Sequence, residues 1–338
     1  MLSFRAFLRR FKVSYAPGFA VLFLFFPGLL LLNAAEHGWA TAQESKPLPQ
    51  TAQPQQPPAP VPAYDKALFQ KPIPSDQLTF LNQFSGVAAM DAFRDKQFRK
   101  LMKSFVPDCM FHYGKDMPLS DALEIVFENS PVPVQIRDGR YILLSGLSGT
   151  HHDGRGFLWI DMQDGIGLGG FYFHPNNGEP TPSVVIFSRQ VVKEDYLRLS
   201  QLTPAFIDDL IQWSTVSRVQ PVTKRYFITG SSKRILLEHN EDYCRFADGT
   251  TAPPASGCEQ MNADAADIDM NAASYLDQTH HATNATAWMI TGADQAAWLQ
   301  VRENTCRTGP DPLGCHIRMT HERTRVILRG SPMPHPHR

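Results

Sequence analysis

Several common sequence features are missing from this 338-residue chain. It contains no internal repeat, and residues 64–240 carry no motif of a known enzyme class. No cysteine follows the N-terminal apolar run at residues 19–32, so this run has no lipoprotein attachment site. The run is also shorter than the roughly 20 residues that a membrane-spanning helix needs, and Pro27 interrupts it. A spanning helix is therefore disfavoured at the N-terminus.

The N-terminus has the organisation of a secretory signal peptide. Four basic residues between positions 5 and 12 precede the apolar run, and Ala40-Thr41-Ala42 supplies a small-x-small cleavage site. We therefore expect a signal peptide at residues 1–42 and a periplasmic or secreted protein. The alternative is an uncleaved anchor, because the cleavage site lies far beyond the apolar run. Only in that case do we expect contact with a membrane.

Composition divides the rest of the chain into a linker and two folded parts. Residues 43–63 contain seven prolines and several glutamines, a composition typical of an extended, semi-rigid tether. The chain that follows is long enough for two domains, which we expect at 64–240 and 241–330, with a tail at 331–338.

Residues 64–240 have the patterns of an α+β domain with antiparallel hairpins. Apolar residues recur at helical spacing in residues 90–105 and 119–127. Alternating apolar residues flank Asp138-Gly139, and a second pair of apolar segments flanks Asp164-Gly165, so each pair predicts a hairpin. Thr203 before Pro204 predicts a helix start, and strands are expected at 184–187, 225–229 and 234–237.

Residues 241–330 are expected to form a small all-α domain stapled by disulfides. Helical segments are predicted near residues 263–278, 287–304 and 315–328. Export to an oxidising compartment favours disulfides, and four of the five cysteines lie in this part. We predict the pairs that are local in sequence, Cys244–Cys258 and Cys306–Cys315, although four cysteines permit three connectivities.

One motif in this part is specific. Gln295, Trp298, Arg302 and Cys306 are followed by Cys315, and then by Thr320 and Arg323. Trp298, Arg302 and Cys306 are four residues apart, which places them on one face of a helix. The order of these residues resembles the lysozyme-inhibitor LprI-like family of small secreted bacterial domains.

Further residues extend this resemblance. Met270-Asn271 and Tyr275 match the family's Leu-Asn-x-x-x-Tyr element, with Met in place of Leu. We interpret Tyr275, Trp298, Arg302 and Arg323 as structural residues. For Arg302 we expect a guanidinium that lies over the indole or pairs with a carboxylate of a neighbouring helix. The resemblance implies an inhibitor rather than an enzyme.

Charge gives a second indication of a partner, in addition to the family resemblance. Residues 64–240 hold 19 acidic and 19 basic residues, whereas residues 241–330 hold 12 acidic and 7 basic ones, a net charge of 7 − 12 = −5. Such a surface favours a cationic protein and disfavours nucleic acid. We therefore expect an envelope protein that binds and inhibits a cationic protein such as lysozyme, with the partner-binding residues Asp264, Asp267, Asp269 and Asp277. A solvated helix start explains the same charges.

Two alternatives remain for function. The first is an envelope hydrolase or transferase with its site in residues 64–240, where Cys109 would be the nucleophile and His112 its base. His151, His152, Asp153 and His174 offer weak spacing for zinc. The second alternative is a structural envelope-assembly factor. We expect no cofactor and no metal, because the calcium-loop pattern starting at Asp267 has Ala272 where glycine is needed and Gln278 where glutamate is needed.

Overall fold

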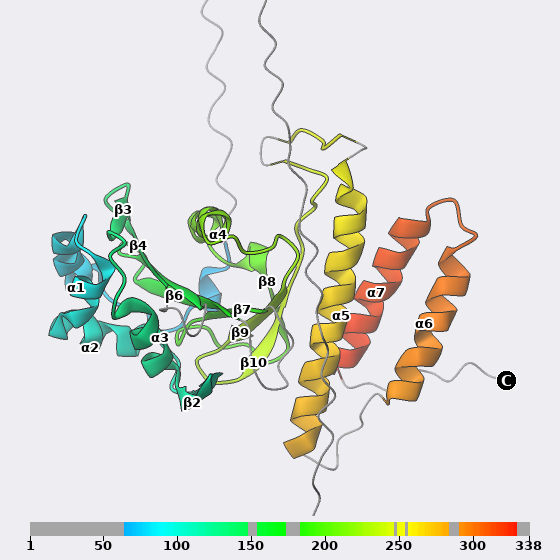
Figure 1. Ribbon diagram of the computed structural model, residues 1–338, viewed down its shortest axis with the longest axis horizontal. Helices are drawn as coiled ribbons and strands as arrows, with labels where there is room; N and C mark the ends of the chain where they lie inside the picture. The colour runs from blue at the N-terminus through cyan, green and yellow to red at the C-terminus, as the bar shows by residue number, and fades with distance from the viewer. Residues whose placement is uncertain are drawn as a thin grey trace, which may run out of the picture. The chain divides into compact units, whose positions relative to one another are not determined.

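A mixed eight-stranded sheet forms the centre of the protein (Figure 1). The computed structural model describes residues 64–147, 154–173, 183–246, 249–253, 256–283 and 291–329. In spatial order the strands are β3 (Gln135–Arg137), β4 (Tyr141–Leu147), β5 (Arg155–Asp161), β6 (Ile166–Phe173), β7 (Ser183–Phe187), β9 (Lys224–Ile228), β10 (Arg234–Glu238) and β8 (Tyr196–Arg198). Neighbours from β3 to β7 are antiparallel, as are β9 and β10. The pairs β7–β9 and β10–β8 are parallel.

Both faces of the sheet are buried, and the strand sequences alternate between two hydrophobic clusters. In β7, Val184 and Ile186 join one cluster, whereas Val185 and Phe187 join the other. This follows from the two-residue period of a strand, whose successive side chains point to opposite faces. A strand that is apolar at every position therefore requires helices on both sides of the sheet.

Different helices cover the two faces. On one face lie α1 (Ala89–Arg94), α2 (Lys96–Phe105), α3 (Leu119–Phe127) and the small hairpin of β1 (Met110–Tyr113) and β2 (Lys115–Pro118). On the other face lies α4 (Pro204–Val216), which buries Phe206, Leu210 and Trp213. Thr203 caps α4 by accepting a hydrogen bond from the Phe206 amide, as its place before Pro204 predicts. Short 3-10 segments occupy Lys66–Leu68, Ser75–Phe84 and Leu199–Gln201.

The single helix expected at residues 90–105 is instead two helices. The chain turns at Asp95, whose backbone is extended with φ −63° and ψ 131°. Its side chain accepts a hydrogen bond from the Phe98 amide at 2.9 Å and so begins α2. The apolar pattern continues through the break because both helices bury residues in the same cluster.

The glycines of β6 make room for aromatic rings rather than for bulges, since the pairing of β5 with β6 is continuous. A Cβ added at Gly167 would lie 2.3 Å from the Phe105 ring. One added at Gly169 would lie 2.3 Å from the Phe187 ring, and at Gly170 2.4 Å from the Phe157 ring. The rings thus pack directly on the backbone of β6.

Three helices form the C-terminal part: α5 (Cys258–Thr283), α6 (Gly292–Cys306) and α7 (Pro312–Arg329). Helix α5 packs on β9 and β10, α7 packs against α5, and α6 packs against α7 (Figure 1). One hydrophobic cluster contains both sheet residues and helical residues such as Met270, Leu276, Trp298 and Ile327. The helices after residue 240 therefore complete the core that covers the sheet.

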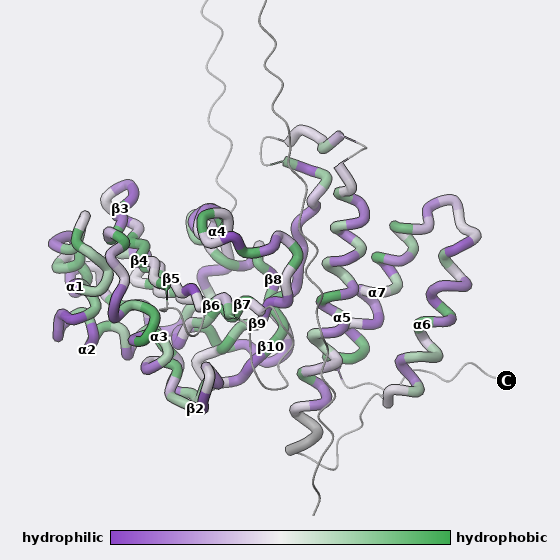
Figure 2. The backbone as a smooth tube through the Cα atoms, in the orientation of Figure 1, coloured by the Kyte–Doolittle hydropathy of each residue, from purple (hydrophilic) through white to green (hydrophobic). Residues whose placement is uncertain are grey.

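Hydropathy separates the central strands from the C-terminal helices. Figure 2 shows hydrophobic residues concentrated around β6, β7 and β9, whereas α6 and α7 alternate between hydrophilic and hydrophobic residues. No helix among the described residues has the length and apolarity needed to cross a membrane. The signal peptide or anchor, the linker and the C-terminal tail expected from the sequence lie outside the described residues.

Candidate functional site

The four aspartates expected to contact a partner occupy four different environments along α5. Asp269 is fully buried, which overturns its expected role at the surface. Its Oδ2 accepts a hydrogen bond from the His239 amide at 2.7 Å, and its Oδ1 lies 2.7 Å from His239 Nδ1. Burial raises the pKa of Asp269, and the hydrogen bonds from His239 oppose that shift. Asp269 thus joins α5 to the end of β10.

Asp267 is partly exposed, but other residues of the C-terminal helices already use its charge. Its Oδ1 accepts a hydrogen bond from Arg302 Nη1 at 2.5 Å and lies 3.0 Å from His316 Nε2. Thr320 Oγ1 accepts a second hydrogen bond from Arg302 Nη1. Asp267 therefore ties α5 to both α6 and α7, and a guanidinium neutralises most of the field that it would offer to a partner.

Asp264 is the exposed member of the four. Its Oδ1 accepts a hydrogen bond from Gln260 Nε2 at 2.8 Å, a neutral partner that leaves its charge in place. Asp277 is half-buried and has an interaction of its own. Tyr275 is half-buried as well, and its ring lies 6.3 Å from the ring of Tyr226 in the sheet. Of the expected set, Asp264 alone is exposed and carries an uncompensated charge.

Trp298 and the two arginines of the motif pack together in the interior of the helical part. The guanidinium carbons of Arg302 and Arg323 lie 5.3 and 5.5 Å from the Trp298 ring centroid. Arg323 Nε also donates to Gln295 Oε1 at 3.0 Å. Arg302 makes both contacts considered for it, one with the indole and one with the Asp267 carboxylate. All three side chains are largely buried, so they hold the helices together.

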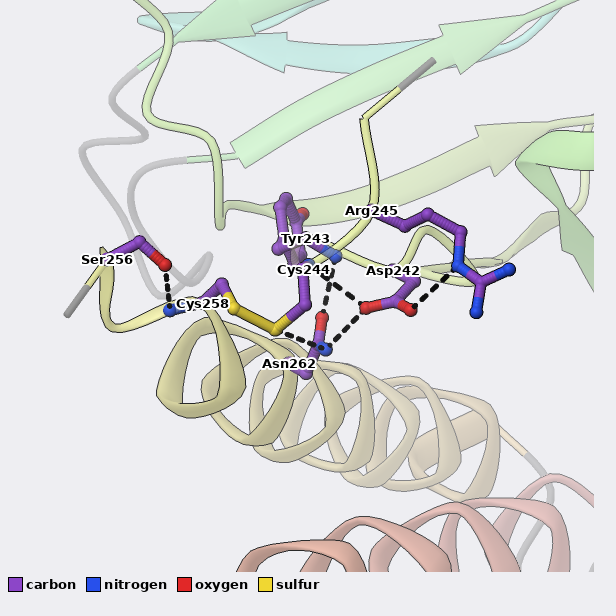
Figure 3. The surroundings of a disulfide bond; sticks show 7 residues. All are labelled: Asp242, Tyr243, Cys244, Arg245, Ser256, Cys258 and Asn262. Atoms are coloured by element: carbon purple, nitrogen blue, oxygen red, sulfur yellow. Dashed lines mark hydrogen bonds and ion pairs between the residues drawn. A yellow bond between two sulfur atoms is a disulfide. The ribbon is translucent and has the colours of Figure 1, made fainter. Parts of the chain in front are cut away.

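The two predicted disulfides are confirmed, Cys244–Cys258 and Cys306–Cys315. Figure 3 shows the surroundings of the first, which joins the segment after β10 to the start of α5. There Asn262 accepts a hydrogen bond from the Tyr243 amide and donates one to Asp242 Oδ1, both at 2.9 Å. The hydrogen bonds from Asn262 and from the Cys244 amide lower the pKa of Asp242 and keep it ionised. Two disulfides are typical of an oxidising compartment.

Exposed carboxylates gather at this end of α5. We call Asp242, Glu259 and Asp264 the α5 acidic end; all three are exposed. Arg245 lies 3.9 Å from Asp242, whereas Glu259 and Asp264 have no ion pair among the described residues. The sequence pattern did not single out Asp242, because only the disulfide and Asn262 bring residue 242 next to α5.

The cysteine of the enzyme alternative faces a cavity without its expected base. Cys109 lines a cavity of about 620 Å³ between α2 and α3, together with Lys96, Lys100 and Arg189. Burial raises the pKa of the Cys109 thiol to about 11, with Arg234 opposing, so the thiol is protonated at neutral pH. His112 is not among the lining residues, and its Nδ1 lies 2.8 Å from Asp116 Oδ1 instead. The structure does not bring this pair together on the cavity.

The other candidates of that alternative are not placed. His151, His152, Asp153 and His174 lie outside the described residues. Within the parts of the chain that the structure describes, no group of three or more His, Cys, Asp or Glu side chains could hold a metal ion.

No family model, curated protein or solved structure matches this sequence. The resemblance to the LprI-like family therefore remains a prediction from the motif residues.

Proposed function

We propose that this chain is an exported bacterial envelope protein, LprI-like in its C-terminal helices, that binds and inhibits a cationic protein such as a lysozyme. The observation that supports this most is the α5 acidic end, where Glu259 and Asp264 are exposed and no cation among the described residues pairs with either. The contact surface is therefore centred on the first two turns of α5 and not on the longer segment at 264–277.

Electrostatics favours this end of the helix over the rest. A carboxylate that already pairs with arginine, as Asp267 does, offers little further attraction to a basic partner. Glu259 and Asp264 are exposed, and no cation among the described residues pairs with either, so both keep their charge. Long-range attraction of this kind raises the association rate and makes the affinity depend on salt.

The rigidity of the α5 acidic end also favours it as the contact surface. The Cys244–Cys258 bond and the two hydrogen bonds of Asn262 fix residues 242–244 against the start of α5 before any partner arrives. A pre-ordered surface loses less conformational entropy on binding than a flexible one. Held over the basic rim of a wall-cleaving enzyme, such a surface would block the substrate cleft by its bulk.

A charge-matched pair of double variants tests the proposal. Glu259→Gln with Asp264→Asn removes two negative charges from the α5 acidic end. Asp121→Asn with Glu124→Gln removes two exposed charges from α3 and serves as the control. We expect the first variant to inhibit lysozyme on cell-wall suspensions about fivefold less well at low salt, from about 0.5 kcal/mol per exposed charge. The control variant should inhibit like the original chain.

Two results would count against the proposal. In the first, the unaltered chain neither slows lysozyme nor binds it in calorimetry. In the second, both double variants lose the same activity, because then net charge and not this surface governs the interaction.

A further inference from the structure

A second cavity lies where α7 meets the ends of β8 and β10. Its volume is about 560 Å³, and its lining comes from both the sheet and the last helix. The lining residues include Arg198, Glu238, His239, His321, Arg325 and Arg329. None of these belongs to the α5 acidic end, so this cavity is independent of the proposed inhibitor surface.

Three of the lining residues carry a buried polar atom that has no hydrogen-bond partner. These atoms are His239 Nε2, His321 Nδ1 and Arg325 Nε. His321 Nδ1 is 3.6 Å from Glu238 Oε1, which is too far for a hydrogen bond. A buried polar group without a partner is costly, and several of them around one cavity indicate a missing ligand.

Of these residues, His239 is almost completely buried, at 3% exposure. Asp269 occupies its Nδ1 and its amide, so Nε2 is the ring nitrogen left without a partner. An imidazole with its proton on Nε2 supplies a hydrogen-bond donor at this position.

The charges around the cavity are mainly positive. The one buried carboxylate, Glu238, is already compensated: Arg198 Nε donates to its Oε2 at 3.0 Å, and Arg325 Nη2 donates to its Oε1 at 3.0 Å. Arg329 is exposed and has no ion pair among the described residues. Glu322 also lines the cavity, and the lining residue Arg318 pairs with Asp311 at 3.2 Å. Three arginines therefore face two carboxylates, and the surplus charge is cationic.

From this arrangement we infer that the cavity is a binding site for a small oxyanion, a phosphate or carboxylate group, that bridges β10 and α7. The anion accepts hydrogen bonds from Arg325 Nε and His239 Nε2 and pairs with Arg329. Arginine suits such groups because its planar fork matches the oxygens of phosphate and carboxylate. A bound anion would hold α7 more firmly against the sheet.

Titration of the purified chain with inorganic phosphate, with acetate and with chloride at equal ionic strength tests this inference. We expect phosphate or acetate to give a saturable rise in melting temperature and a saturable heat in calorimetry, while chloride gives neither. The anion that binds more tightly, phosphate or acetate, identifies whether a phosphate or a carboxylate group is the natural ligand. The His239 Nε2 resonance in nitrogen-15 spectra should shift in parallel with binding.

Two arginine variants separate this cavity from general charge effects. Arg329→Gln removes a lining cation, and Arg307→Gln removes an exposed cation at the end of α6, outside the cavity. The first should weaken anion binding about tenfold, as expected for one charge-assisted hydrogen bond, and the second should leave it unchanged. The inference is overturned if chloride acts like the other anions, if both variants respond alike, or if the His239 resonance does not move.

Discussion

Replacing Asp269 should lower the free energy of unfolding without changing the surface of the protein. Asp269 lies at 0% exposure between α5 and the end of β10, where its Oδ2 accepts a hydrogen bond from the His239 amide and its Oδ1 lies 2.7 Å from His239 Nδ1. Asp269→Ala leaves both the amide and the ring nitrogen of His239 buried without a partner. Asp269→Asn keeps an acceptor for the amide and offers its NH₂ group to the ring. The two variants therefore differ in how much of the contact survives.

The size of each effect follows from burial. Removing one partner of a buried pair costs about 3–5 kcal/mol, because the other partner stays desolvated. We therefore expect Asp269→Ala to lower the free energy of unfolding by about 4 kcal/mol and Asp269→Asn by about 1–2 kcal/mol. Asp264→Asn, five residues earlier on the exposed side of α5, should change it by less than about 0.5 kcal/mol.

Urea unfolding followed by circular dichroism measures these differences, with the midpoint and slope compared among the three variants. Lysozyme binding, measured well below the melting temperature, should be unaffected by Asp269→Asn and weakened by Asp264→Asn. The reasoning is refuted if Asp269→Ala is as stable as the unaltered chain. It is refuted also if Asp269→Asn loses lysozyme affinity while its stability is unchanged, since that would place Asp269 at the contact surface.

Two further predictions concern the disulfides and acid stability. Breaking Cys244–Cys258 by a double serine substitution should lower the free energy of unfolding by about 3 kcal/mol, and breaking Cys306–Cys315 should lower it by about 2.5 kcal/mol. The two values follow from the sequence separations of 14 and 9 residues that the disulfides close. Urea titrations that show an equal loss for both, or no loss, would contradict the entropic account. Burial alone would raise the pKa of Glu238, but the nearby His321 ring, 3.6 Å away, and hydrogen bonds from Arg198 and Arg325 outweigh it and lower the pKa from 4.5 to about 2. The ionised side chain therefore stabilises the fold above pH 4.5, and about 3 kcal/mol is lost as the pH falls from 4.5 to 2. Glu238→Gln should flatten this part of the stability curve, while Glu303→Gln should not.

The sequence predicted those helices and hairpins whose ends are determined by residues close together in the chain. The apolar spacing of α3 places its ends at residues 119 and 127, as observed, because its buried face is complete within nine residues. The hairpins around Asp138-Gly139 and Asp164-Gly165 followed from turn residues that need a positive φ, which Asp138, Gly139 and Gly165 adopt. The short strand β8 was missed because its three residues pair in parallel with β10, a partner far along the chain.

The burial of Asp269 could have been predicted from its position in the helix, but its charge suggested an exposed side chain instead. Ala266, Asp269, Ala273 and Leu276 recur at helical spacing, so Asp269 falls within the apolar stripe of α5. Its sequence type suggested the surface, whereas its position on the helix indicated the interior. The identity of its partner, His239, could not be found this way, because the contact crosses thirty residues from α5 to the sheet. The cavity beside it has the same long-range origin.

Calorimetric titration of the whole chain into lysozyme, at about 20 mM and about 150 mM ionic strength, tests the proposed function most directly. The screening length falls from about 20 Å to about 8 Å over this range, so a contact made by exposed carboxylates must weaken. We expect saturable binding at low salt, at least tenfold weaker binding at high salt, and loss of most of the low-salt affinity in the Glu259→Gln, Asp264→Asn variant. No binding at low salt, or an affinity that ignores both salt and that variant, would contradict the account.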